Sequence, residues 1–118
     1  MKSYKDLIVW QKAIELVIEI YRLTANFPKS ELYGLVTQMK RAVVSICSCI
    51  AEGFGRKSRK EKDQFYLIAF GSALELENQI IISKRLGFID PKDSIRADKL
   101  LTEVLKMLNK LTSNSRTY

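Results

Sequence analysis

The chain has 118 residues, of which 47% are hydrophobic and 28% are charged, so it is long enough for one domain with a substantial core but not for two. Its net charge of +7 favours polyanionic partners, nucleic acid first and an acidic membrane surface second, although many basic proteins use such charge only for solubility. There is no histidine, which removes the commonest general base and metal ligand. Only two prolines and five glycines interrupt the chain, and this favours long helices.

The first helix is predicted over about residues 4–26, where apolar residues recur at three- and four-residue spacing. It ends at Phe27, because Pro28 disfavours helical geometry at the residue before it. The N-terminal apolar run is short and meets charge at Lys12, so it is neither a secretory signal nor a membrane span. We expect no other apolar segment to approach the roughly 20 residues of a spanning helix, and therefore no membrane partner.

The second helix is predicted over about residues 31–53, with Ser30 as its N-cap and with Gly53 and Gly55 as flexible residues suited to its end. Cys47 and Cys49 lie two residues apart on this helix and point about 200° away from each other. They cannot easily form a disulfide or share a metal. Buried free thiols and a cytoplasmic location are therefore expected.

The third helix is predicted over about residues 58–86, with Ser58 as its N-cap and Gly87 just beyond its end. Its apolar residues exceed one face, as in the run from Ile80 to Ile82, and the first helix is similarly wide. A helix that is apolar over more than one face needs more than one neighbour. Both helices therefore favour self-association, unless long bundle helices simply have wide apolar stripes.

The fourth helix is predicted over about residues 91–113, because Asp90 and Pro91 form a strong N-cap and first-turn pair. No linker or repeat divides the chain, so residues 1–118 are expected to form a single all-α domain. Four helices with short connections predict an antiparallel up-and-down four-helix bundle.

The most basic segment, RKSRKEK at residues 56–62, joins the second and third helices. Cations at a helix N-terminus oppose the helix dipole, so stability alone does not explain them, whereas the same helix end favours phosphate. The alternative is a solvated helix start that keeps the protein soluble. We predict a nucleic-acid-binding site here and a second, lateral patch on the second helix. The candidate residues are Arg56, Lys57, Arg59, Lys60, Lys62, Lys40 and Arg41.

An antiparallel bundle brings this turn together with the start of the first helix and the end of the fourth. The expected basic end has an excess of five positive charges. Its residues are Lys2, Lys5, Arg56, Lys57, Arg59, Lys60, Lys62, Lys106, Lys110 and Arg116, against Asp6, Glu52, Glu61, Asp63 and Glu103. Phe54 and Tyr66 are aromatic candidates for stacking on bases, but burial in the core is the stronger expectation.

Catalysis has little support in the sequence. Glu75 and Glu77 place their carboxylates on different helix faces, unlike the Glu-x-x-His spacing of a bundle di-iron site. The glycines around Phe54 lack the Gly-Lys-Ser/Thr ending and the preceding strand of a phosphate-binding loop. No serine has a visible base to activate it. We therefore predict a non-enzymatic protein without catalytic residues, metal or cofactor.

Several segments resemble one known family in both order and spacing. They are Trp10-Gln11-Lys12-Ala13, Phe27-Pro28, Tyr33-Gly34-Leu35, Ala51-Glu52-Gly53 with Gly55-Arg56, and Gly71-Ser72. Over roughly residues 6–89 the chain is similar to bacterial four-helix-bundle proteins encoded in intervening sequences of 23S ribosomal RNA genes. The fourth helix matches only in being helical.

This resemblance implies a ring-like homopentamer with a basic surface that binds nucleic acid. A relative of the same fold is the accessory protein of diversity-generating retroelements, which works with a reverse transcriptase and its RNA. One departure lies in the second helix, where Cys47 and Cys49 replace the proline and asparagine of the family pattern S-I-P-S-N-I-A-E-G. Without the proline this helix should be straighter, and any role of the asparagine is not carried over.

Two hypotheses follow. The first is a cytoplasmic, pentameric, non-enzymatic protein that binds nucleic acid, with structured RNA favoured, through its basic end. The second is an oligomeric protein-interaction scaffold, or an accessory factor for a reverse-transcriptase-like partner, whose basic end serves solubility. Phosphate contacts release counterions, so the salt dependence of binding distinguishes the two.

Overall fold

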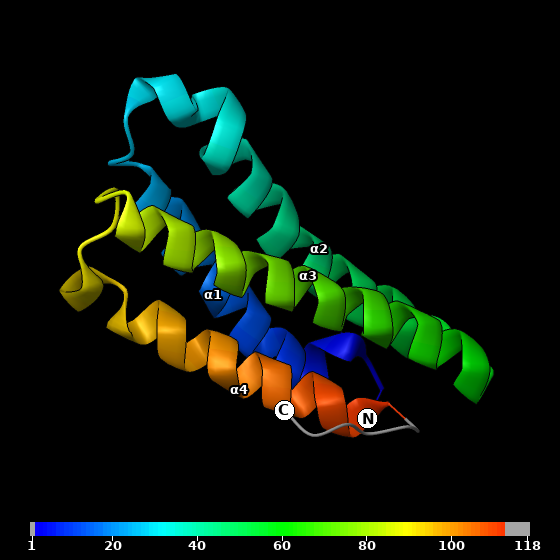
Figure 1. Ribbon diagram of the computed structural model, residues 1–118. Helices are drawn as coiled ribbons and strands as arrows, with labels where there is room; N and C mark the ends of the chain where they lie inside the picture. The colour runs from blue at the N-terminus through cyan, green and yellow to red at the C-terminus, as the bar shows by residue number, and fades with distance from the viewer. Residues whose placement is uncertain (1, 113–118) are drawn as a thin grey trace.

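The computed structural model describes residues 2–112, and Figure 1 shows their four long helices packed lengthwise into a bundle. The helices are α1 (Ile8–Thr24), α2 (Thr37–Gly55), α3 (Arg59–Arg85) and α4 (Ile95–Leu111). Consecutive helices run in opposite directions, α1 packs on α2 and α4, and α3 packs on the same two helices from the other side. The predicted all-α four-helix fold is confirmed.

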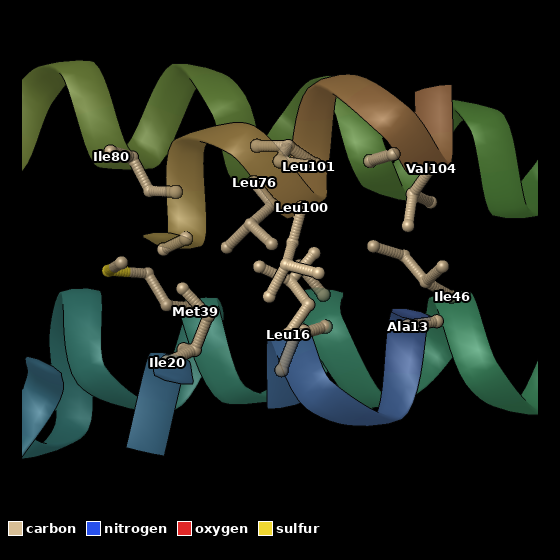
Figure 2. Close-up of a cluster of buried hydrophobic side chains, with 14 of the residues drawn as sticks. Ala13, Leu16, Ile20, Met39, Ile46, Leu76, Ile80, Leu100, Leu101 and Val104 are labelled. Atoms are coloured by element: carbon tan, nitrogen blue, oxygen red, sulfur yellow. The ribbon is translucent and has the colours of Figure 1, made fainter. Parts of the chain in front are cut away.

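One hydrophobic core runs through the bundle. Figure 2 shows side chains of α1 and α2 meeting those of α3 and α4 across it. Leu16, Ile46, Leu76 and Val104, one from each helix, have no exposed surface. Burial of each such side chain contributes about 1.5–3 kcal/mol to the free energy of unfolding. The core therefore follows the three- and four-residue spacing seen in the sequence.

The first helix is shorter than the predicted range 4–26, because α1 begins only at Ile8. The preceding residues form a 3-10 turn closed by a capping box, in which the Ser3 hydroxyl and the Asp6 carboxylate each accept a backbone N–H. Leu7 is extended (φ −72°, ψ 125°) and separates this turn from the helix. A local side-chain cap thus competes with helix propagation.

The second helix also begins later than the predicted range 31–53, and Ser30 is not its N-cap. The chain first makes a 3-10 turn and then a π turn in which Gly34 (φ −114°, ψ −112°) departs from helical geometry. The Glu31 carboxylate accepts a backbone N–H of this π turn at 3.4 Å. Regular α-helix begins only at Thr37.

The third helix agrees with the predicted range 58–86 to within one residue at each end. The Ser58 hydroxyl accepts the backbone N–H of Glu61 at 3.1 Å, as expected for an N-cap. Gly87 adopts a positive φ of 80° just beyond the helix, a conformation that glycine reaches without steric cost. Both predicted caps of this helix are confirmed.

The fourth helix starts later than the predicted range 91–113. Asp90 does act as a cap, accepting the backbone N–H of Lys92 at 3.1 Å, but it caps a separate 3-10 turn over Pro91–Asp93. The α-helix begins at Ile95. The predicted end at residue 113 lies outside the described residues.

The longest helix, α3, has an apolar outer side. In Figure 1 the α2–α3 hairpin projects beyond the start of α1 and the end of α4. By length and composition alone, α3 is long and apolar enough to cross a membrane, which we did not expect from the sequence. A helix that buries one face in the core of a bundle can have the same length and composition. Its outer side exposes Leu67, Leu74 and Ile81, and α1 exposes Ile18. The predicted extra apolar faces of both helices are confirmed.

Candidate nucleic-acid interface

Close packing between α2 and α3 holds the basic hairpin in place. Of the two glycines predicted at the end of this helix, Gly55 is its last residue, whereas Gly53 is buried inside α2 and does not end it. A Cβ atom at Gly53 would lie 2.7 Å from Cε1 of Tyr66 and 3.1 Å from Cβ of Phe65. Gly53 is therefore required for the close approach of the two helices, and Tyr66 is buried, as expected.

The side chain of Lys62 turns back onto the end of α2. Its Nζ donates to the backbone oxygens of Phe54 at 2.7 Å and Gly53 at 3.3 Å, and it lies 5.5 Å from the centre of the Phe54 ring. Carbonyls in the last turn of a helix have no partner within the helix, and a lysine can satisfy them. Lys62 thus stabilises the end of α2 instead of presenting its charge to a ligand.

Arg59 connects the start of α3 to the end of α4. Its Nη2 donates to the Asp63 carboxylate at 2.6 Å and also to the backbone oxygen of Leu111. The guanidinium lies 5.9 Å from the centre of the Tyr66 ring. The hairpin and the end of α4 therefore meet at one end of the bundle, as the topology predicted.

Arg56 lies flat against the hairpin but keeps part of its guanidinium in solvent. It sits 4.6 Å from the centre of the Phe65 ring and pairs with Glu52 at 3.6 Å. The side chain remains 43% exposed. Such an exposed ion pair is weak, so Arg56 can exchange Glu52 for a phosphate at little cost.

Lys57 and Lys60 extend into solvent from the start of α3. Both are exposed, and within residues 2–112 neither forms a hydrogen bond, ion pair or ring contact. They flank Ser58 at the first turn of α3, where backbone N–H groups lack helical partners. Positive charge and N–H donors are thus concentrated at the same helix end.

The predicted lateral patch lies on the side of the bundle, away from the hairpin. Lys40 and Arg41 line a shallow groove of about 360 Å³ between α1 and α2, where the Lys40 Nζ is 4.5 Å from the centre of the Tyr21 ring. Arg41 also lines a groove of about 420 Å³ between α2 and α3, opposite Glu75. The carboxylate offsets part of the positive charge, so this patch is a weaker anion site than the hairpin.

Cations on the outer side of α4 extend from the hairpin end of the bundle towards its opposite end. Lys99, Lys106 and Lys110 are all exposed and lie seven and four residues apart, on one face of the helix. Lys106 and Lys110 were expected at the basic end, whereas Lys99 lies near the start of α4, towards the opposite end of the bundle, and was not among the candidate residues. The helical spacing of the three lysines is the signal that could have identified it. Arg116 lies outside the described residues.

With this geometry in view, the family comparison is decisive. The model of the family described as 23S rRNA-intervening sequence protein matches residues 5–110. The chain belongs to this family. Its fold is also similar to the crystal structure of a protein of unknown function from the S23 ribosomal protein family of Bacteroides thetaiotaomicron VPI-5482, with a TM-score of 0.80 and 23% identity over 91% of this chain and 100% of that one. Among curated proteins, none matches the sequence.

The remaining chemistry of this family member is modest. Both cysteines are free, as predicted, but only Cys47 is buried, since Cys49 is half-buried. Burial raises the pKa of the Cys47 thiol to about 11, so it stays protonated at neutral pH. Burial also raises the pKa of Tyr66. Within residues 2–112 no three His, Cys, Asp or Glu side chains gather in a way that could hold a metal ion. The described surface therefore offers charge as its main means of recognition.

Proposed function

We propose that this protein is a non-enzymatic, cytoplasmic homo-oligomer that binds structured RNA through its α2–α3 hairpin. The observation that carries the proposal is that Lys57 and Lys60, on either side of the Ser58 cap of α3, are exposed and form no hydrogen bond, ion pair or ring contact within residues 2–112. Each cation there is unfavourable by a few tenths of a kcal/mol because it opposes the helix dipole. A bound phosphate reverses this cost, since it is attracted both to the lysines and to the helix end.

Contacts of this kind position a nucleic acid without reading its sequence. The shape of the RNA should therefore matter more than its bases, and the exposed guanidinium of Arg56 adds a further contact. The resemblance to the family favours RNA over DNA.

The outer side of α3 supports self-association. Leu67, Leu74 and Ile81 recur there at seven-residue spacing, each between 39% and 50% exposed, with Ile68 and Ile82 beside them. Contiguous exposed apolar surface of this kind commonly marks an interface. A second copy of the chain would bury it, and the family resemblance implies five copies in a ring. Such a ring repeats the hairpin, so weak individual phosphate contacts combine into a stronger one.

The test is anisotropy of a labelled structured RNA, titrated with wild-type protein and with the double variant Lys57→Gln/Lys60→Gln at several salt concentrations. We expect the dependence of log affinity on log salt to flatten in the variant by about 1.4–1.8 per subunit in contact, because two phosphate contacts are lost. The matched control, Lys29→Gln/Lys92→Gln, removes the same charge from exposed lysines at the opposite end of the bundle. Salt-independent binding, or an equal loss in the control, would contradict the proposal.

A second candidate function is an oligomeric scaffold, or an accessory factor for a reverse-transcriptase-like partner. It is favoured by the groove between α2 and α3, where Arg41 and Glu75 offer opposite charges next to the apolar outer side of α3. Recovery of the same protein partner from the native host before and after nuclease treatment would favour this alternative over RNA binding.

A further inference from the structure

The outer face of α4 is a basic stripe. Lys99, Lys106 and Lys110 are exposed along it, with Thr102 between the first two and Ile95 at its start. Within residues 2–112 none of the three lysines forms a hydrogen bond or an ion pair. Glu103 lies at helical spacing between these lysines, four residues after Lys99 and three before Lys106, on the side of this face that meets α1.

The two acidic residues of α4 are directed towards its neighbours. The Asp98 carboxylate accepts from Nζ of Lys84 on α3 at 2.7 Å and from the Ser94 hydroxyl at 3.1 Å. Glu103 pairs with Lys12 on α1, and this contact holds the pKa of Glu103 below its usual range. Each carboxylate is therefore matched by a cation of another helix. Glu103 also interacts electrostatically with Lys99, so Lys12 and Lys99 share one carboxylate, whereas Lys106 and Lys110 form no ion pair within residues 2–112.

Helix stability does not account for this arrangement. Lys106 and Lys110 are like charges four residues apart, a spacing at which they repel each other on a helix surface. Lys110 is in the last turn, where a cation interacts favourably with the helix dipole. Lys99 and Lys106 lie outside the last turn and gain little from it. An anionic partner would supply the missing counter-charge.

The stripe is continuous with the hairpin. Arg59, in the first turn of α3, donates to the backbone oxygen of Leu111 at the end of α4. The Lys110 end of the stripe therefore adjoins the turn that carries Lys57 and Lys60. From Lys99 to Lys110 the rise of an α-helix makes the stripe about 16 Å long. That length corresponds to about five base pairs along a nucleic-acid duplex.

We propose that the outer face of α4 is a second phosphate-binding surface, on which an RNA lies lengthwise with one end at the α2–α3 hairpin. This inference rests on the proposed RNA-binding function and names the residues that extend its site: Lys99, Lys106 and Lys110. The three ammonium groups contact the phosphate backbone without reading bases, since the stripe carries no planar or bidentate side chain.

An anionic membrane surface fits the stripe less well. A helix that binds at a membrane surface inserts an apolar face beside its basic face. The apolar face of α4 is instead buried in the bundle core, where Leu101, Val104 and Leu108 are at most 2% exposed. The stripe is therefore complementary in charge to RNA phosphates, whereas α4 has no free apolar face that could insert into a membrane.

The experiment compares RNA binding by wild-type protein and the triple variant Lys99→Gln/Lys106→Gln/Lys110→Gln by anisotropy across salt concentrations. Losing three phosphate contacts should lower the log–log salt slope by about 2–3. Between about 50 and about 200 mM salt the wild type should then lose roughly 40-fold more affinity than the variant. The matched control, Lys29→Gln/Arg85→Gln/Lys92→Gln, removes three charges at the opposite end of the bundle and should leave the slope near the wild-type value. Circular dichroism establishes that each variant is folded.

The outcomes separate this inference from the function on which it rests. An α4 variant that behaves like the control, while the hairpin variant loses binding, overturns the stripe and leaves RNA binding at the hairpin. No RNA binding by the wild type overturns both. Binding of anionic vesicles but not of RNA, abolished in the α4 variant, also overturns the inference and assigns the stripe to a membrane surface.

Discussion

Replacing Lys62 with methionine should weaken folding without weakening RNA contacts. Methionine keeps the apolar stem beside the Phe54 ring but removes the donor that reaches the Phe54 carbonyl at 2.7 Å and the Gly53 carbonyl at 3.3 Å. Hydrogen bonds from a charged group contribute about 1.5–3 kcal/mol. Lys62 is only partly buried and its second contact is long, so we expect the free energy of unfolding to fall by about 1 kcal/mol. For a chain of this size that lowers Tm by about 5 °C.

The assay pairs thermal unfolding, followed by circular dichroism at fixed protein concentration, with RNA anisotropy across salt concentrations. Lys62→Met should lose stability and keep the wild-type salt slope. The contrasting variant, Lys57→Gln/Lys60→Gln, should stay within about 0.5 kcal/mol of wild-type stability and lose salt slope. A lower slope in Lys62→Met with unchanged stability would refute the assignment of this lysine to the end of α2.

Three further predictions concern packing, assembly and titration. Gly53→Ala should lower the free energy of unfolding, measured in urea, by about 1–2 kcal/mol, because the cost of overpacking against Tyr66 is larger than the gain in helix propensity. Gly55→Ala should not lower it, because there is open space around Gly55. Equal effects of the two substitutions would contradict the packing argument. Leu74→Lys should reduce the molar mass of the particle measured by light scattering, because it disrupts self-association, while the helix content is kept. An unchanged molar mass would contradict self-association through this side of α3. Burial raises the pKa of Cys47 from 9.0 to about 11, so only the thiol of the unfolded chain ionises between these values. The free energy of unfolding should therefore fall as pH rises from about 9 towards about 11. Urea unfolding of Cys47→Ala should show less of this fall, and an equal pH dependence in both proteins would contradict the role of Cys47.

The sequence predicted the existence of the four helices more accurately than the residues at which they begin. Three- and four-residue spacing marks a buried stripe directly, so all four helices and most of the core follow from it. Three helix starts were placed too early because short polar side chains hold competing turns. Ser3, Glu31 and Asp90 each accept a backbone N–H of a 3-10 or π turn that delays the α-helix. Only α3 begins directly at its cap, Ser58.

The candidate site was predictable as a cluster of charge but not in the roles of its members. Lys62 and Arg59 find partners on other elements, the end of α2 and the Leu111 carbonyl of α4, and these depend on how the helices pack. Lys57 and Lys60 have the same charge as these two residues and lie in the same segment of the sequence, yet within residues 2–112 they have no partner and are available to a ligand. Tertiary packing, which local pattern does not encode, decides which cation is structural.

The central claim, that RNA binds at the α2–α3 hairpin, is tested most directly by ultraviolet crosslinking of a structured RNA to the purified wild-type protein. Mass spectrometry of the digested complex then locates the crosslinked peptide. We predict RNA adducts on the segment from Phe54 to Phe65, and their loss in Lys57→Gln/Lys60→Gln. Adducts confined to other segments, or none at an RNA concentration that saturates anisotropy, would contradict the claim.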